Sequence, residues 1–62
     1  MCLSTVYKNT REEASIAMKN VMQLQCADGQ VTLTDLMGRT LTITGELVEA
    51  NLVDGFVIVR EK

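Results

Sequence analysis

Hydrophobic and polar residues alternate along most of the chain, and four glycines divide this alternation into short segments. A period of two is typical of β-strands that bury one face. The pairs Asp28-Gly29 and Asp54-Gly55 fall between segments, and Asp-Gly favours the tight turns of β-hairpins. The pattern predicts an all-β chain, folded as a small SH3-like or Sm-like barrel of five to six antiparallel strands.

Most of the expected strands are short, and one segment is ambiguous. Residues 12–20 contain good helix formers. Yet Ala14, Ile16 and Met18 alternate with smaller or polar neighbours, so we predict a strand there. The other predicted strands cover residues 2–8, 21–27, 30–34 and 56–60, and a long strand that begins over 39–44, bends at Gly45 and continues over 47–52.

The phase of the alternation predicts which side chains face the core. Met22, Leu24 and Cys26 share one face, and we interpret Cys26 as a small core residue. Gly45 interrupts the longest periodic segment, where a bulge or bend is the usual meaning. Residues 56–60 are apolar on both faces, which predicts burial on both faces or cover by another subunit. The other residues expected inside are Met18, Val31, Leu33, Met37, Leu41 and Ile43.

Length and composition predict one domain, residues 1–62, that associates with a second copy. Of the 62 residues, 47% are hydrophobic, but only Tyr7 and Phe56 are aromatic. A chain this short has a small interior. We therefore expect a homodimer, with its contact near the first or last strand. A single, densely packed core is the alternative.

Charge and residue content argue against several functions. The net charge is −2 and the basic residues are scattered, which argues against nucleic-acid binding. No apolar run approaches the ~20 residues of a membrane span, and no signal peptide is visible, so we expect a cytoplasmic protein. The chain has no histidine and no visible nucleophile–base pair, so we do not expect an enzyme.

The first two residues carry the most distinctive chemistry. Cys2 places a thiol beside the chain's amino group, and these donors suit Ni(II) or Cu(II). If Met1 stays, its amine, the Cys2 amide and the Cys2 thiolate offer three donors. If Met1 is removed, two Cys2 ends can form an N₂S₂ plane across a dimer axis. The alternative is that Cys2 is merely a small residue at the chain start.

Several stretches of the chain together form a recognisable set, namely Met1-Cys2-Leu3-Ser4, Val6-Tyr7, Val31-Thr32-Leu33-Thr34-Asp35-Leu36-Met37-Gly38, Gly45-Glu46-Leu47 and Leu52. Through these residues the sequence resembles the CooT-like family, small accessory proteins of nickel insertion into carbon monoxide dehydrogenase. The resemblance implies a homodimeric β-barrel that binds Ni(II) through Cys2 and serves a client nickel enzyme. Two alternatives stay open: an RNA-binding small barrel, as relatives are often labelled, and a metal-independent protein-interaction module.

Overall fold

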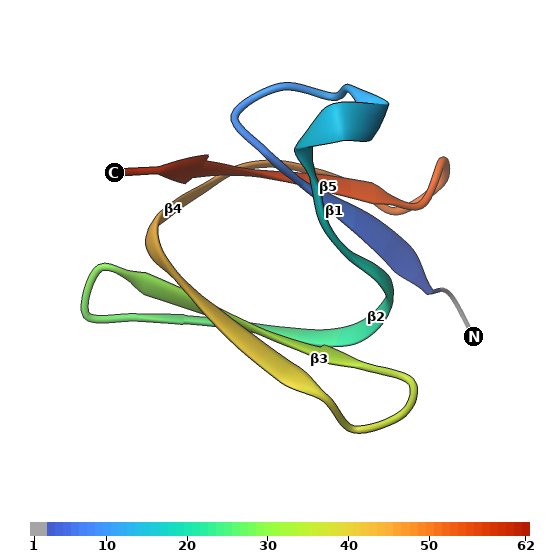
Figure 1. The fold of residues 1–62 in the computed structure, drawn as a ribbon, viewed down its shortest axis with the longest axis horizontal. Coiled ribbons are helices and arrows are strands. Elements are labelled where there is room, and N and C mark those ends of the chain that lie inside the picture. The colour runs from blue at the N-terminus through green and yellow to red at the C-terminus, as the bar shows by residue number, and fades with distance from the viewer. Residues whose placement is uncertain (1–2) are drawn as a thin grey trace.

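Five β-strands follow one another around a closed barrel in a computed structural model that describes residues 3–62 (Figure 1). Sequential neighbours pair antiparallel, and β1 closes the ring by pairing parallel with β5. The prediction of a small all-β barrel is confirmed. The elements are β1 (Ser4–Lys8), the 3-10 helix η1 (Glu13–Ser15), β2 (Ile16–Ala27), β3 (Gln30–Asp35), β4 (Thr40–Asn51) and β5 (Phe56–Glu61).

The ambiguous segment divides between two structures, so the strand predicted over residues 12–20 is partly wrong. Residues Glu13–Ser15 form η1, and β2 begins only at Ile16. From there β2 continues without a break to Ala27, so the two strands predicted over residues 12–27 are one long strand. Asn20 takes a positive φ of 55°, which lets this strand bend rather than end.

The core lies inside the barrel and consists of aliphatic side chains. Val31 and Leu33 point inward as predicted, and both are fully buried. Because the inner faces of all five strands contribute, the core needs no helix to cover it. Its buried members are Val6, Val21, Val31, Leu33, Ile43, Val57 and Val59.

One apolar face of β5 is buried in the core, and the other is partly covered within the chain, with Phe56 buried and Ile58 half-buried. Val57 and Val59 point into the barrel core. Phe56, also buried, is covered by the Tyr7 ring, whose centroid lies 6.5 Å away edge-on. The guanidinium of Arg11 stacks 3.9 Å from the Phe56 ring centroid, in a cation–π contact. The loop before η1 therefore covers Phe56 on the outer face of β5. From the sequence alone, a second subunit was one of the two expected sources of this cover.

Several residues predicted inside are on the surface. Cys26 is exposed, so its interpretation as a core residue is wrong. Its cross-strand partner Val31 is fully buried, but Cys26 lies on the edge of β2 beyond the last β1–β2 pair, Ser4–Val21, and so lacks the cover that β1 gives. Met22 is 51% exposed because the β2–β3 register shifts between Val21 and Gln23, which leaves Met22 as an extra, bulged residue. Met37 and Leu41 are also exposed.

Gly45 marks the point where β4 changes partners. Residues up to Thr44 pair with β3, and residues from Gly45 pair with β5. A β-carbon at Gly45 would overlap the carbonyl oxygen of Arg60, so only glycine allows this close approach. The predicted bulge lies slightly later, between Leu47 and Glu49.

Candidate functional site

The predicted metal ligands, Met1 and Cys2, lie outside the described residues 3–62. The structure does describe the strand to which they are joined. Ser4 pairs with Val21 on β2, and the Thr5 N–H donates a 2.9 Å hydrogen bond to the carbonyl of Gly55. The first strand is thus held on both sides. Two residues of chain span at most about 7 Å, which limits how far Cys2 can lie from Ser4.

An apolar hollow of about 210 Å³ opens beside Ser4. β2 forms one wall, and β4, β5 and the turn between them form the other. Among residues 3–62, no charged residue lines the hollow. The hollow therefore favours an uncharged occupant, because a charge placed there would lose hydration without gaining a partner. Its apolar lining residues are Val21, Met22, Leu24, Leu47, Ala50, Leu52 and Val57.

Two turns near the start of the chain expose large apolar side chains. In the β3–β4 turn, Leu36 is 54% and Met37 is 78% exposed. In the β4–β5 turn, Leu52 is 70% and Val53 is 96% exposed. Figure 1 shows both turns at the end of the long axis where the described chain begins. Exposed apolar clusters of this kind mark interaction surfaces. We call these four residues the apolar tips.

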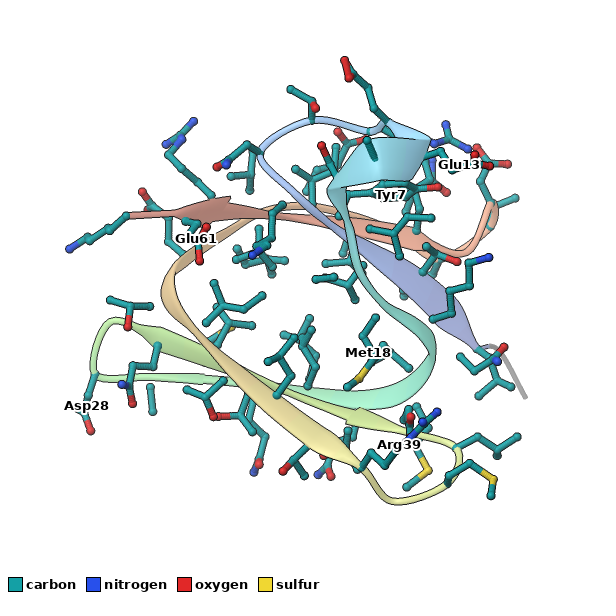
Figure 2. All side chains as sticks on the ribbon, viewed as in Figure 1. Tyr7, Glu13, Met18, Asp28, Arg39 and Glu61 are labelled. Carbon is teal, nitrogen blue, oxygen red and sulfur yellow. The ribbon has the colours of Figure 1, made fainter. Side chains whose placement is uncertain are left out.

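The β3–β4 turn is held by a buried carboxylate. Asp35 is 2% exposed, and its Oδ1 accepts hydrogen bonds from the backbone N–H groups of Met37 and Arg39, each 2.9 Å long. Its Oδ2 accepts a third bond from Nε of Arg39 at 2.7 Å. Figure 2 shows Arg39 at this end of the barrel.

These contacts set the ionisation of Asp35. Desolvation by burial would raise the pKa of Asp35, but the hydrogen bonds and positive charge of Arg39, with the Met37 N–H, outweigh it. The pKa therefore lies below its ordinary value. The carboxylate stays ionised near neutral pH and is fully engaged in the turn, so it has no capacity left for acid–base chemistry. Asp35 therefore has a structural role in the turn.

Asn51 holds the β4–β5 turn in a similar way. Its Oδ1 accepts hydrogen bonds from the backbone N–H groups of Val53 and Asp54, at 3.1 Å and 2.9 Å. Its Nδ2 donates to Oδ2 of Asp54 at 3.2 Å. Both turns are thus shaped by a polar side chain at their start. Met37 and Val53 contribute only their backbone N–H groups to these hydrogen bonds, and their side chains take no part in them.

Within residues 3–62, no three Cys, Asp or Glu side chains lie close enough together to hold a metal ion. Cys26, the other cysteine, stands alone on the surface. The metal role of Met1 and Cys2 therefore stays a prediction. Sequence reasoning missed the apolar hollow and the apolar tips. The adjacent apolar pairs Leu36-Met37 and Leu52-Val53, at turn positions that are usually polar, were the available signal.

Comparisons with known proteins agree with the fold. Residues 1–60 match the family model described as CO dehydrogenase accessory protein CooT. A crystal structure of a Carboxydothermus hydrogenoformans protein described as CooT superposes with a TM-score of 0.84, covering 98% of each chain at 18% sequence identity. At this identity the structural match supports the fold alone. No curated protein sequence matches the chain. Among the helices of residues 3–62, none has the length and apolar character that crossing a membrane requires.

Proposed function

Because the chain belongs to the CooT family of CO dehydrogenase accessory proteins, we propose that it binds Ni(II) at its N-terminus and delivers the ion to a client nickel enzyme. The family description makes carbon monoxide dehydrogenase the first client to test. In this proposal the protein is a carrier and not a catalyst. The cytoplasm, where thiols stay reduced, is the compartment that suits a metal-binding Cys2 thiol.

The donor chemistry at Met1 and Cys2 supports nickel as cargo. A thiolate with nitrogen donors favours the square-planar geometry of Ni(II). Binding must displace the proton of the thiol, and that of the amine where it is a ligand, so affinity should rise with pH. Copper would bind the same donors more tightly by the usual order of metals, so selectivity for nickel must come from metal availability and the client.

The apolar tips support the homodimer. They lie at the end of the barrel where the described chain begins (Figure 1). Two copies that met through this end would bury the tips and bring their first strands together. Two N-termini could then share one ion, with Cys2 thiolates from both chains as ligands. A small domain with little core also gains stability from such an interface.

The observation that carries the proposal is the family match that includes Cys2, joined to a first strand that β2 and β5 hold in place. A fixed strand keeps the search volume of a short N-terminal segment small. This lowers the entropy lost when its donors gather around one ion.

The test is Ni(II) titration by calorimetry together with native mass spectrometry. We expect one Ni(II) for each dimer in the unmodified chain and loss of at least ten-fold in affinity for Cys2→Ser. Cys26→Ser is the matched control, because it removes the other thiol from an exposed position far along the chain, and it should bind as the unmodified chain does. Equal nickel binding by Cys2→Ser would reject the proposal.

A further inference from the structure

One edge of β2 is open over the second half of the strand. Within residues 3–62, the pairing of β1 with β2 ends at the Ser4–Val21 pair. The pairing of β2 with β3 continues on the opposite edge as far as Ala27. Of the described residues, none pairs with β2 on the β1 side beyond Val21. The side chains there are mostly exposed, so the edge is accessible to solvent.

The β2–β3 turn identifies which backbone groups face this edge. Asp28 and Gly29, with φ of 52° and 74°, form a two-residue turn, which makes Ala27 and Gln30 a hydrogen-bonded pair. Hydrogen-bonded and non-hydrogen-bonded pairs alternate along an antiparallel ladder. The N–H and C=O groups of Leu24 and Cys26 therefore point away from β3, toward the open edge.

Hydrogen bonds on the other side of β3 agree with this alternation. The Gly45 N–H donates to the Gly29 carbonyl at 2.9 Å, and the Asp35 N–H donates to the Arg39 carbonyl at 2.9 Å. Odd-numbered residues of this part of the chain thus bond to β4, as the turn geometry requires. Even-numbered residues of β3 bond to β2.

The open edge lacks the usual protection against added strands. Natural edge strands carry lysine, proline or inward charges that prevent pairing with another chain. Residues 22–27 read Met-Gln-Leu-Gln-Cys-Ala and contain neither charge nor proline. The bulge at Met22 limits pairing only at one end. An edge strand without such protection can form backbone hydrogen bonds with a strand of a partner.

The apolar hollow lies against the same strand. Val21, Met22 and Leu24 form its β2 wall, and Leu47 and Leu52 face them. Its volume of about 210 Å³ is below the ~300–1,000 Å³ of small-molecule pockets, so it suits single side chains. A strand added beside β2 would lie over the opening and could direct alternate side chains into it.

We propose that the open edge of β2 and the apolar hollow together bind an extended, uncharged segment of a partner protein. The backbone groups of Leu24 and Cys26 bind its main chain, and the hollow takes its apolar side chain. This is recognition by strand addition. It does not depend on nickel, so it can fail or succeed independently of the proposed carrier function.

A peptide segment fits this edge better than a second copy of the chain. Leu24 and Cys26 alone offer bonding groups, which is the reach of a short strand. A stable subunit interface buries about 800 Å² on each partner. Among the described residues, the apolar tips Leu36, Met37 and Val53 are large exposed side chains outside the hollow and better placed for subunit contact.

The test uses a capped heptapeptide of alternating leucine and threonine with a lysine at each end, titrated into the ¹⁵N-labelled chain without nickel. We expect saturable shifts of the Leu24 and Cys26 amide signals and slower hydrogen exchange of both. The same peptide with aspartate in place of leucine should bind at least ten-fold more weakly. No saturable shift at millimolar peptide, or shifts spread evenly over the barrel, would overturn the proposal.

Two variants with matched controls separate the backbone and side-chain contributions. Cys26→Pro removes an N–H that the β2–β3 ladder does not use, whereas Cys26→Ser keeps it. Leu52→Asp places a charge in the hollow, whereas Val53→Asp places one on the adjacent residue, which does not line it. We expect Cys26→Pro and Leu52→Asp each to weaken peptide binding at least ten-fold, and the two controls to change it less than two-fold.

Four further results would support or overturn the proposed strand addition. Equal loss in Leu52→Asp and Val53→Asp would overturn the proposed role of the hollow. If Cys26→Pro converts a dimer of the unmodified chain into a monomer by sedimentation, the edge is occupied by a second copy and the proposal is wrong. Peptide binding that persists in Cys2→Ser would support it as a function separate from nickel. Peptide binding that disappears in Cys2→Ser would overturn that independence.

Discussion

The two ends of the barrel differ in what their turns expose. At one end, the β2–β3 turn consists of Asp28 and Gly29, which are polar or lack a side chain. At the other, the β3–β4 and β4–β5 turns expose the apolar tips Leu36, Met37, Leu52 and Val53. Figure 2 labels Asp28 at the first end and Arg39 near the second.

This difference separates the residues that shape a turn from those that are free for contact. Asp35 and Asn51 fix the conformations of the two apolar turns through bonds to backbone N–H groups. The intervening side chains have no structural task there, yet they are large and apolar. Because exposed apolar area is unfavourable in water, a partner that covers this end gives these residues a use.

The largest loss of folding stability should come from a substitution at Gly45, which lies between the two ends of the barrel. Gly45→Val would drive a side chain into the Arg60 carbonyl and separate β4 from β5. We expect a loss of about 3 kcal/mol, enough to unfold much of so small a domain. Urea unfolding followed by circular dichroism measures it. Thr44→Val, on the neighbouring exposed position, is the control and should stay folded. A stable Gly45→Val would contradict the close approach of the two strands.

At the apolar end, substitutions of Asp35 should have the largest effect on folding stability. Asp35→Ala removes three hydrogen bonds to the turn, and Asp35→Asn keeps only those that an amide oxygen can accept. Because the folded pKa of Asp35 is lowered, its contribution is present above the unfolded pKa of about 4 and is lost as pH falls through the folded pKa. Thermal unfolding from pH 7 to pH 2 should show a smaller pH dependence for Asp35→Asn. An unchanged dependence would exclude this role.

Backbone strain should be alike at the two ends. Gly29 and Gly38 have φ of 74° and 84°, and a β-carbon at either would meet nothing within 4 Å. Gly29→Ala and Gly38→Ala should therefore each cost about 1–2 kcal/mol through conformation alone. Asparagine at either position should cost less, since it tolerates positive φ. Unequal costs, measured by chemical denaturation, would show that the ends also differ in their backbones.

The hydrogen bonds of Asn51 should contribute less to folding stability than those of Asp35. Asn51→Ala removes the acceptor for two backbone N–H groups in an exposed turn, which should cost about 1 kcal/mol. Asn51→Asp combined with Asp54→Asn is the matched control, because it keeps the acceptor at position 51 and reverses the side-chain hydrogen bond without setting two carboxylates against each other. Hydrogen exchange of the Val53 and Asp54 amides should become faster only in Asn51→Ala. If both variants exchange equally fast, the side-chain bonds do not hold this turn.

The smallest effect on folding should come from the apolar tips. Met37→Gln with Val53→Thr should change the free energy of unfolding by less than about 0.5 kcal/mol, because both side chains are solvent-exposed. The same double variant should weaken self-association, which native mass spectrometry can detect. Thr32→Gln, on the outer face of β3, is a control away from this end. A dimer that survives in the double variant would place the subunit contact elsewhere.

The sequence predicted the strands well because alternation and turn residues act locally. Val31 and Leu33 face inward, and Asp28-Gly29 forms a hairpin turn, as expected. The prediction of buried residues failed where one extra residue shifted the alternation of inward and outward side chains. It also failed where the burial of a side chain depended on a strand distant in the sequence. The bulge at Met22 turned a residue predicted inside toward solvent. Alternation tells which residues share a face, but it does not tell which neighbours cover that face.

By itself, the sequence supplied the adjacent pair Met1-Cys2 as the candidate metal ligands, because covalent adjacency requires no fold. It also determined the all-β architecture, through local periodicity and turns. Only the tertiary structure decided that Cys26 is exposed, that β2 has an open edge, and that an apolar hollow lies beside Ser4. These features depend on where β1 stops pairing and where β4 changes partners. Such contacts join residues far apart in the chain, and no local pattern records them.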